Sequence, residues 1–208
     1  MSYSLNDIKT DIVTLDEKSF FDKYYMGESI WYIDEYLKPI DTLQCTNRYK
    51  EIVATFLGVD RKNVFMSGSA KFGFSLSPPK DGYNKLYLPF NNDESVRKLS
   101  DIDMTVISEV LFRRFWILYR SSYKLTLESL YVSIKNDLYR GFINEKHVLN
   151  VEGCRAEWNN LTRHMKAQLK KELGFRHDLN LRIYYSMEDY YEYTRTGIHK
   201  IKKLEAGK

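Results

Sequence analysis

Apolar and polar side chains follow one another along this chain with the two periods that distinguish helices from strands. Residues 155–173 show the helical period most clearly, because apolar side chains return every three or four positions while arginine, asparagine and lysine occupy the other face. The segment 47–57 also places its apolar residues on one face, and it ends at Gly58. The same spacing predicts further helices at 109–121, 126–140 and 187–204.

Three shorter segments have the pattern of β-strands. Residues 63–66 are an apolar run of strand length, and residues 101–107 alternate before they become apolar, as a buried strand does. Residues 179–185 alternate as well. These few strands, interleaved with many helices, predict an α/β or α+β domain.

The N-terminal part is helical in pattern and rich in aromatic side chains. Residues 17–37 predict one or two helices, broken near Gly27 and stopped before Pro39. We therefore expect residues 1–60 to form a helical segment that packs on a core made by residues 61–208. Within that core, residues 77–100 contain three of the four prolines and no sustained period, which predicts an insertion loop.

Charge is distributed unevenly between these two parts. Residues 1–60 carry 11 acidic and 6 basic side chains, whereas residues 61–208 carry 17 acidic and 26 basic ones. A basic body suits an anionic ligand such as a nucleotide or RNA.

The composition of the 208 residues also excludes several classes of protein. No apolar run approaches the ~20 residues of a membrane span, and the first residues lack the basic and apolar regions of a secretory signal. The two cysteines, Cys45 and Cys154, cannot build a disulfide framework. We therefore expect a cytoplasmic protein without a membrane partner.

Two segments of the sequence together predict a site for a metal ion and a triphosphate. Gly68 and Ser69 follow a predicted strand, and such a turn offers an unobstructed backbone and a hydroxyl group to a triphosphate. Asp101 and Asp103 open the next strand, where residues two apart point to the same face. Two neighbouring carboxylates repel one another, and Mg²⁺ or Mn²⁺ removes that repulsion while leaving positions for phosphate oxygens. Lys71 adds a cation at the same edge, either as a phosphate contact or as an ordinary surface lysine.

This arrangement of residues 63–107 resembles the signature of the nucleotidyltransferase fold, the superfamily of DNA polymerase beta and of the poly(A) and CCA-adding enzymes. The resemblance is to small bacterial or phage members of the kind found in defence and toxin–antitoxin systems. It implies a small mixed sheet flanked by helices. It also implies that Gly68 and Ser69 hold the triphosphate of an NTP, while Asp101 and Asp103 bind the metal and are catalytic. The implied reaction transfers a nucleoside monophosphate to a hydroxyl group of an RNA, a protein or a nucleotide.

The chain departs from that pattern at a third carboxylate, which catalytic members carry on a later strand. The predicted strand 179–185 offers Arg182 instead, and a guanidinium cannot act as a base near neutral pH. Arg182 is therefore predicted to contact a carboxylate or a phosphate of the nucleotide. The nearest candidates for the third acid are Asp178, Glu188 and Asp189.

Two alternatives to an enzyme follow from this departure. The first is a catalytically silent protein of the same fold that binds a nucleotide or a partner, such as a sensor. The second is an interaction protein without a nucleotide site, such as an antitoxin or inhibitor that binds its partner through the aromatic N-terminal helices.

Overall fold

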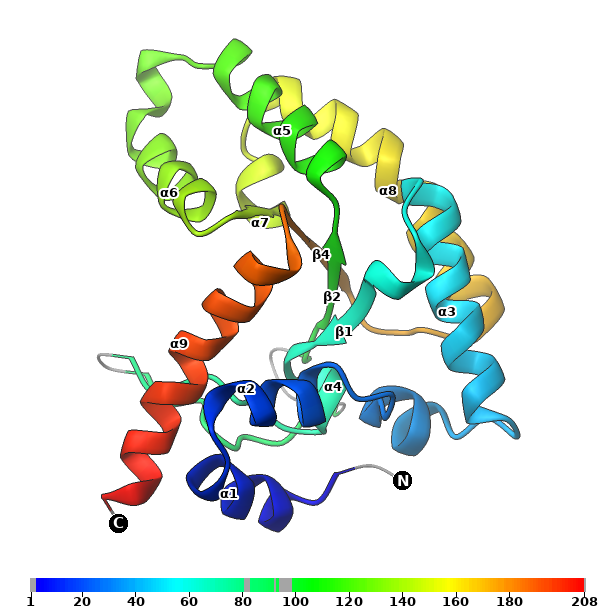
Figure 1. The fold of residues 1–208 in the computed structure, drawn as a ribbon. Helices are drawn as coiled ribbons and strands as arrows, with labels where there is room; N and C mark the ends of the chain where they lie inside the picture. The colour runs from blue at the N-terminus through cyan, green and yellow to red at the C-terminus, as the bar shows by residue number, and fades with distance from the viewer. Residues whose placement is uncertain (1–2, 81–82, 92, 94–98, 208) are drawn as a thin grey trace.

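The computed structural model describes residues 3–80, 83–91, 93 and 99–207, and its centre is a four-stranded mixed sheet (Figure 1). The strands lie in the order β1-β2-β4-β3. β2 pairs antiparallel with β1 on one side and parallel with β4 on the other, and β3 pairs antiparallel with β4. The bounds of the strands are β1 Val64–Ser67, β2 Ile102–Ile107, β3 Phe142–Asn144 and β4 Leu179–Tyr184.

Helices surround this sheet. Those that precede β2 are α1 (Leu5–Thr14), α2 (Glu17–Phe20), the π-helices η1 (Phe21–Tyr25) and η2 (Tyr32–Leu37), α3 (Thr42–Leu57), the 3-10 turn η3 (Arg61–Asn63) and α4 (Gly68–Phe72). Those that follow are α5 (Glu109–Ser121), the 3-10 turn η4 (Leu125–Leu127), α6 (Glu128–Tyr139), α7 (Glu145–Val148), α8 (Glu152–Leu173) and α9 (Met187–Ala206). Short polar side chains cap several of them, since Ser108 accepts a hydrogen bond at the start of α5 and Ser186 at the start of α9.

The two faces of the sheet have different surroundings, as the alternation of side chains along a strand requires. One face is wholly apolar and packs against α3, α5 and α8, through Val64, Met66, Met104, Val106, Leu181 and Ile183. The other face carries both apolar and polar side chains and lies toward η1 and α9. Asp103, Thr105 and Arg182 belong to this second face. The predicted site residues Asp103 and Arg182 therefore lie on the face of the sheet that is directed toward α9.

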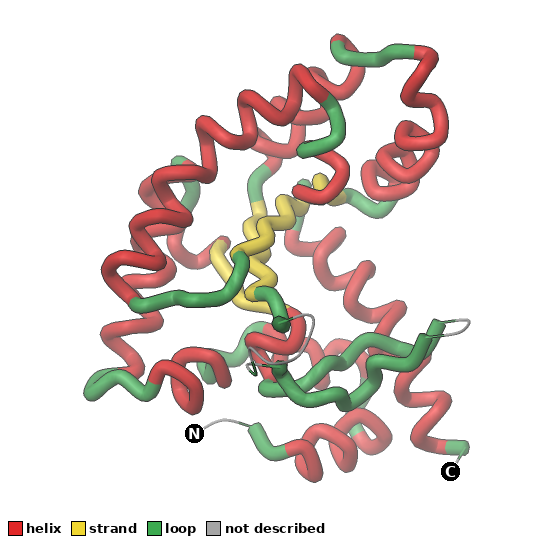
Figure 2. Tube along the Cα trace, turned by 180° about the vertical axis from the view of Figure 1, so that it is seen from behind, coloured by secondary structure: helices red, strands yellow, loops and turns green. Residues whose placement is uncertain are grey.

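Part of the predicted insertion is tied to the rest of the molecule. Residues 83–91 return along residues 73–76, because the N–H of Ser75 donates to the carbonyl of Leu88 and the N–H of Phe90 donates to that of Gly73. Phe90 is buried against Trp31 and Tyr32. This loop is visible from behind in Figure 2. Residues 81–82, 92 and 94–98 of the insertion lie outside the described residues.

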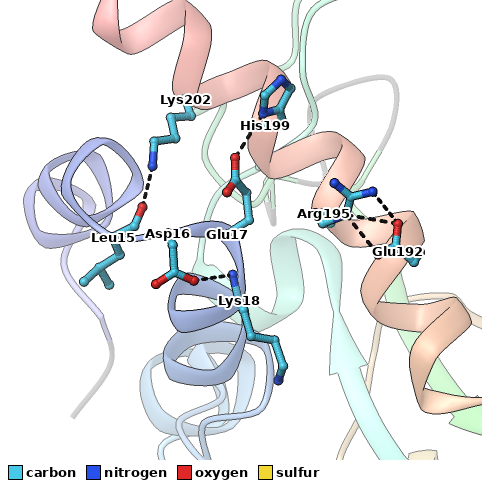
Figure 3. A network of polar contacts seen from close by, with 8 residues as sticks. All are labelled: Leu15, Asp16, Glu17, Lys18, Glu192, Arg195, His199 and Lys202. Atoms are coloured by element: carbon cyan, nitrogen blue, oxygen red, sulfur yellow. Dashed lines mark hydrogen bonds and ion pairs between the residues drawn. The ribbon is translucent and has the colours of Figure 1, made fainter.

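The N-terminal helices α1 and α2 pack against α9 (Figure 3). The ammonium of Lys202 donates a 2.6 Å hydrogen bond to the carbonyl of Leu15, and the ring of His199 lies 3.0 Å from the carboxylate of Glu17. These contacts tie the C-terminal half of α9 to α1 and α2.

The structure confirms the expected fold class, a mixed α+β protein. It corrects two details. β3 has only three residues, too few to show a period, and its pairing with β4 comes from tertiary contact rather than from local pattern. The strand expected to open at Asp101 begins one residue later, at Ile102. Within the described part of the chain, no helix combines the length and apolar character needed to cross a membrane.

Candidate functional site

Gly68 and Asp103 come from segments far apart in the sequence and meet at the end of β1. Gly68 has φ +64°, and a Cβ atom placed on it would lie 2.4 Å from Oδ2 of Asp103. Asp103 faces the last residue of β1, Ser67, in the antiparallel pairing, which explains why its carboxylate lies over the turn that follows. Glycine is needed here both for its conformation and for the space that the carboxylate occupies.

A serine hydroxyl that the sequence did not single out, that of Ser67, contacts the main chain of Asp103. Ser67 Oγ lies 3.1 Å from Oγ1 of Thr105 and 3.4 Å from the main-chain oxygen of Asp103. Ser67 and Gly68 line the cavity described below, and Ser69 does not. Ser67 is the last residue of β1, and its side chain points into the cavity because of how β1 pairs with β2. That pairing could not be predicted from the sequence.

Asp101 lies just before β2 and is held by the neighbouring strand. The side-chain amide of Asn180 donates a 2.6 Å hydrogen bond to Oδ2 of Asp101. The N–H of Ile102 donates to the carbonyl of Asp178, which continues the pairing of β2 and β4 to this point. Asn180 is directly opposite Asp103 in the parallel register, so one amide side chain lies beside both acids.

The two acids influence each other electrostatically. The pKa of Asp103 is raised to about 6, mainly by burial and secondly by the negative charge of Asp101, while the positive charges of Arg182 and Lys85 oppose the shift. Such a shift means that an ionised Asp103 is costly unless a cation compensates it.

A cavity of about 560 Å³ opens between this face of the sheet, α9 and the start of the loop after α4. Asp103, Gly68 and Arg182 line it together with several tyrosines and with basic side chains at its edge. Its tyrosines are Tyr25, Tyr139, Tyr184, Tyr190 and Tyr193, and its other basic residues are Lys80, Arg140 and Lys200. A second hollow of about 390 Å³ lies between α5 and α6 and contains none of the predicted site residues.

Arg182 reaches this cavity from β4, in register with Thr105. Its guanidinium contacts the rings of Phe142 and Tyr193 and donates a long hydrogen bond of 3.4 Å to the hydroxyl of Tyr184. The structure thus places Arg182 in the same cavity as Asp103, but among the described residues it makes no ion pair with a carboxylate. The predicted contact with a phosphate stays a prediction.

Lys71 lies elsewhere. Its side chain is only 3% exposed, and its ammonium donates hydrogen bonds to the carbonyls of Gly27 and Ser29. Burial lowers the pKa of Lys71 to about 7. The structure therefore corrects both expected roles, a phosphate contact and a surface lysine. The side chain is buried, and its ammonium links α4 to the loop between the two π-helices.

The three candidates for the third acid have different surroundings. Asp178 and Glu188 are exposed and do not line the cavity. Asp189 lines it, with its carboxylate bonded to the hydroxyl of Ser186 and packed against Gly141. Among the three, Asp189 is therefore the acid that shares a cavity with Asp103.

Asp101 and Asp103 are the two side chains that would hold a hard divalent cation, and of the two only Asp103 lines the cavity. Both side chains supply carboxylate oxygens, and the two negative charges repel each other, so a bound cation would be electrostatically favourable. No cluster of three or more metal-binding side chains was found among the described residues. Water and phosphate oxygens would therefore complete the coordination, as Mg²⁺ prefers.

We compared the chain with protein-family models, with curated proteins and with solved structures, and none of them matches it.

Proposed function

We propose that this protein binds a nucleoside triphosphate with Mg²⁺ or Mn²⁺ and transfers the nucleoside monophosphate to an acceptor hydroxyl. The observation that carries the proposal is the contact between Gly68 and the carboxylate of Asp103 at the edge of a basic, tyrosine-rich cavity. A glycine turn beside a buried acid is suited to bring phosphate oxygens and a metal-binding carboxylate together.

In the proposed reaction the acceptor oxygen forms a bond to the α-phosphorus while the bond from that phosphorus to the β-phosphate oxygen breaks. Pyrophosphate leaves with the electron pair, and the hydroxyl proton passes to the carboxylate of Asp189. Asp101 and Asp103 hold the metal, which when bound neutralises charge on the phosphates. Arg182 provides a further positive charge on the cavity wall.

A specific observation favours a second candidate, nucleotide binding without turnover. The positions of β4 that face Asp103 and Thr105 carry Asn180 and Arg182, and neither side chain can accept a proton near neutral pH. In this candidate Asp189 contributes no base, and the protein acts as a sensor or as a partner in a complex.

Incubation with each α-³²P-labelled NTP, Mg²⁺ and total cellular RNA or protein tests both candidates. Transfer of label that is lost in Asp103→Asn and reduced at least tenfold in Asp189→Asn supports the enzyme. Asp103-dependent NTP binding without transferred label supports the silent protein. If neither binding nor transfer depends on Asp103, both candidates are wrong.

A further inference from the structure

The cavity contains a guanidinium, that of Arg182, which forms no ion pair with a carboxylate of the described residues. Within that part of the chain, its one hydrogen bond is to the hydroxyl of Tyr184 and is 3.4 Å long. A guanidinium has five N–H donors, so most of them have no acceptor in the described protein.

The acids of the cavity are engaged with other groups. Glu192 pairs with Arg195, and Asp189 accepts a hydrogen bond from Ser186. Asp103 affects Arg182 only through its charge, from beyond ion-pair distance. Removing a cation from water without a partner is costly, and the cost disappears when an anion binds.

The aromatic contacts of Arg182 leave one side of it open. Its Cζ lies 5.0 Å from the ring centre of Phe142 and 5.1 Å from that of Tyr193, and the two ring centres are themselves 5.0 Å apart. A guanidinium stacked between two rings would hold them at about twice that separation. Both rings therefore lie to one side of the guanidinium and fix its orientation. Arg182 and Tyr193 both line the cavity, so we infer that the uncovered side of the guanidinium is the one that a ligand in the cavity would meet.

The position of Arg182 in the sheet separates it from the turn at Gly68. Gly68 follows β1 and Arg182 lies on β4, and Asp103 on β2 is between them. Along the strands, Arg182 is displaced from the level of Asp103 by two residues, or roughly 7 Å. If the triphosphate lies over Gly68, the second reactant lies on the β4 side, where Arg182 is.

We propose that Arg182 binds a phosphate group of the acceptor, with Lys200 and Arg140 at the edge of the cavity as supporting charges. The acceptor is then a phosphate-bearing nucleotide, either free or at the end of an RNA, rather than a protein hydroxyl. A planar guanidinium with free N–H donors can bind two oxygens of one phosphate. This inference rests on the proposed function, since that function supplies the second reactant.

Equilibrium binding in EDTA tests the inference without the metal site. The probes are inorganic phosphate, the four nucleoside monophosphates, adenosine, and a five-nucleotide RNA with and without a terminal phosphate. The variants are Arg182→Gln and Arg182→Lys. The matched control is Arg163→Gln, which removes an exposed arginine of α8 and lies outside the cavity.

We expect the wild-type protein to bind the phosphorylated probes at least tenfold more tightly than adenosine or the unphosphorylated RNA. Arg182→Gln should lose at least tenfold in that affinity, Arg182→Lys should lose less, and Arg163→Gln should lose none. Tighter binding of the phosphorylated RNA than of the monophosphates identifies an RNA end as the source, and the opposite order identifies a free nucleotide. Equal binding by the wild-type protein and Arg182→Gln, or no binding of any phosphorylated probe, overturns the inference.

Melting curves keep this test independent of folding and of the proposed function. Arg182→Gln keeps a long polar side chain at this position, so the variant should remain folded, and phosphate should raise the melting temperature of the wild-type protein only. Loss of Mg-NTP binding in Asp103→Asn tests the proposed function separately. Phosphate binding through Arg182 without Asp103-dependent Mg-NTP binding would refute the proposed function and leave the anion site intact.

Discussion

The side-chain amide of Asn180 donates a 2.6 Å hydrogen bond to the carboxylate of Asp101, across the parallel pair of β2 and β4. Because Asn180 is also the register partner of Asp103, this neutral amide lies beside two acids that repel each other. Replacing it with an acid should therefore reveal whether the site is suited to a cation.

Asn180→Asp should lower the free energy of unfolding by about 1–3 kcal/mol in EDTA, because it replaces a donor with a third negative charge. Millimolar Mg²⁺ should recover most of that loss. Asn159→Asp, an exposed change of the same charge on α8, should show neither effect. Urea melts with and without Mg²⁺ make the comparison, and a loss that Mg²⁺ leaves unchanged would argue against a cation at Asp101 and Asp103.

Gly68→Ala should abolish Mg-NTP binding. A Cβ there meets Oδ2 of Asp103 at 2.4 Å and displaces the carboxylate. Gly174→Ala is a closely matched control, since Gly174 also has a positive φ, +69°, but nothing lies within 4 Å of its added Cβ. Both changes should cost about 1 kcal/mol of stability through backbone strain. Calorimetric titration with NTP and Ca²⁺ should distinguish them, and equal affinities would remove Gly68 from the site.

Asp103→Asn should stabilise the metal-free protein at pH 7.5 by about 1–3 kcal/mol. The folded protein holds the proton of Asp103 more tightly than the unfolded chain does, because burial raises its pKa to about 6. The wild-type protein therefore loses stability as the pH rises from about 4 through 6, and the variant does not share that loss. The difference should vanish near pH 4. Chemical denaturation across this range in EDTA provides the measurement, with exposed Asp178→Asn as the control.

Lys71 should make the stability of the protein depend on pH in the direction opposite to that of Asp103. Because burial lowers its pKa to about 7, the unfolded chain binds more protons than the folded protein above pH 7. Wild-type stability should therefore rise relative to Lys71→Met between pH 6 and pH 9, by up to about 1.4 kcal/mol per pH unit. Denaturant melts at fixed pH measure this slope, and exposed Lys171→Met should show no difference in slope from the wild-type protein. Parallel curves for the wild-type protein and Lys71→Met would mean that Lys71 stays charged throughout.

The long amphipathic helices and the buried strands could be predicted from sequence, because their patterns have enough repeats to show a period. The helix expected at 109–121 has those bounds in the structure, and the strand expected at 179–185 is β4, Leu179–Tyr184. β3 could not be predicted in this way, since three residues contain no repeat and its pairing partner is distant in the sequence.

Some residues of the candidate site could be predicted from the sequence, and others could not. The strand pattern predicted that Asp101 and Asp103 point to one face, and the resemblance to the nucleotidyltransferase signature placed Gly68 beside them. Lys71 looked like an edge cation because its sequence neighbours are at the edge, whereas the π-helices that bury it come from a segment about 40 residues earlier. The roles of Ser67 and Asn180 depend on the register between strands, which one sequence does not specify.

The pairing of β2 with β4 has a consequence for how this protein folds. The bond from Asn180 to Asp101 closes a loop of 79 residues, and α5, α6 and α8 all lie inside that loop. Helices form quickly from local contacts, whereas a parallel strand pair must first overcome the entropy of bringing distant segments together. We therefore expect Asp101 and Asp103 to come into contact with Asn180 of β4 late in folding. In a chain emerging from the ribosome, the candidate site is therefore incomplete until β4 has been synthesised and docked, even when most of the helices have already formed.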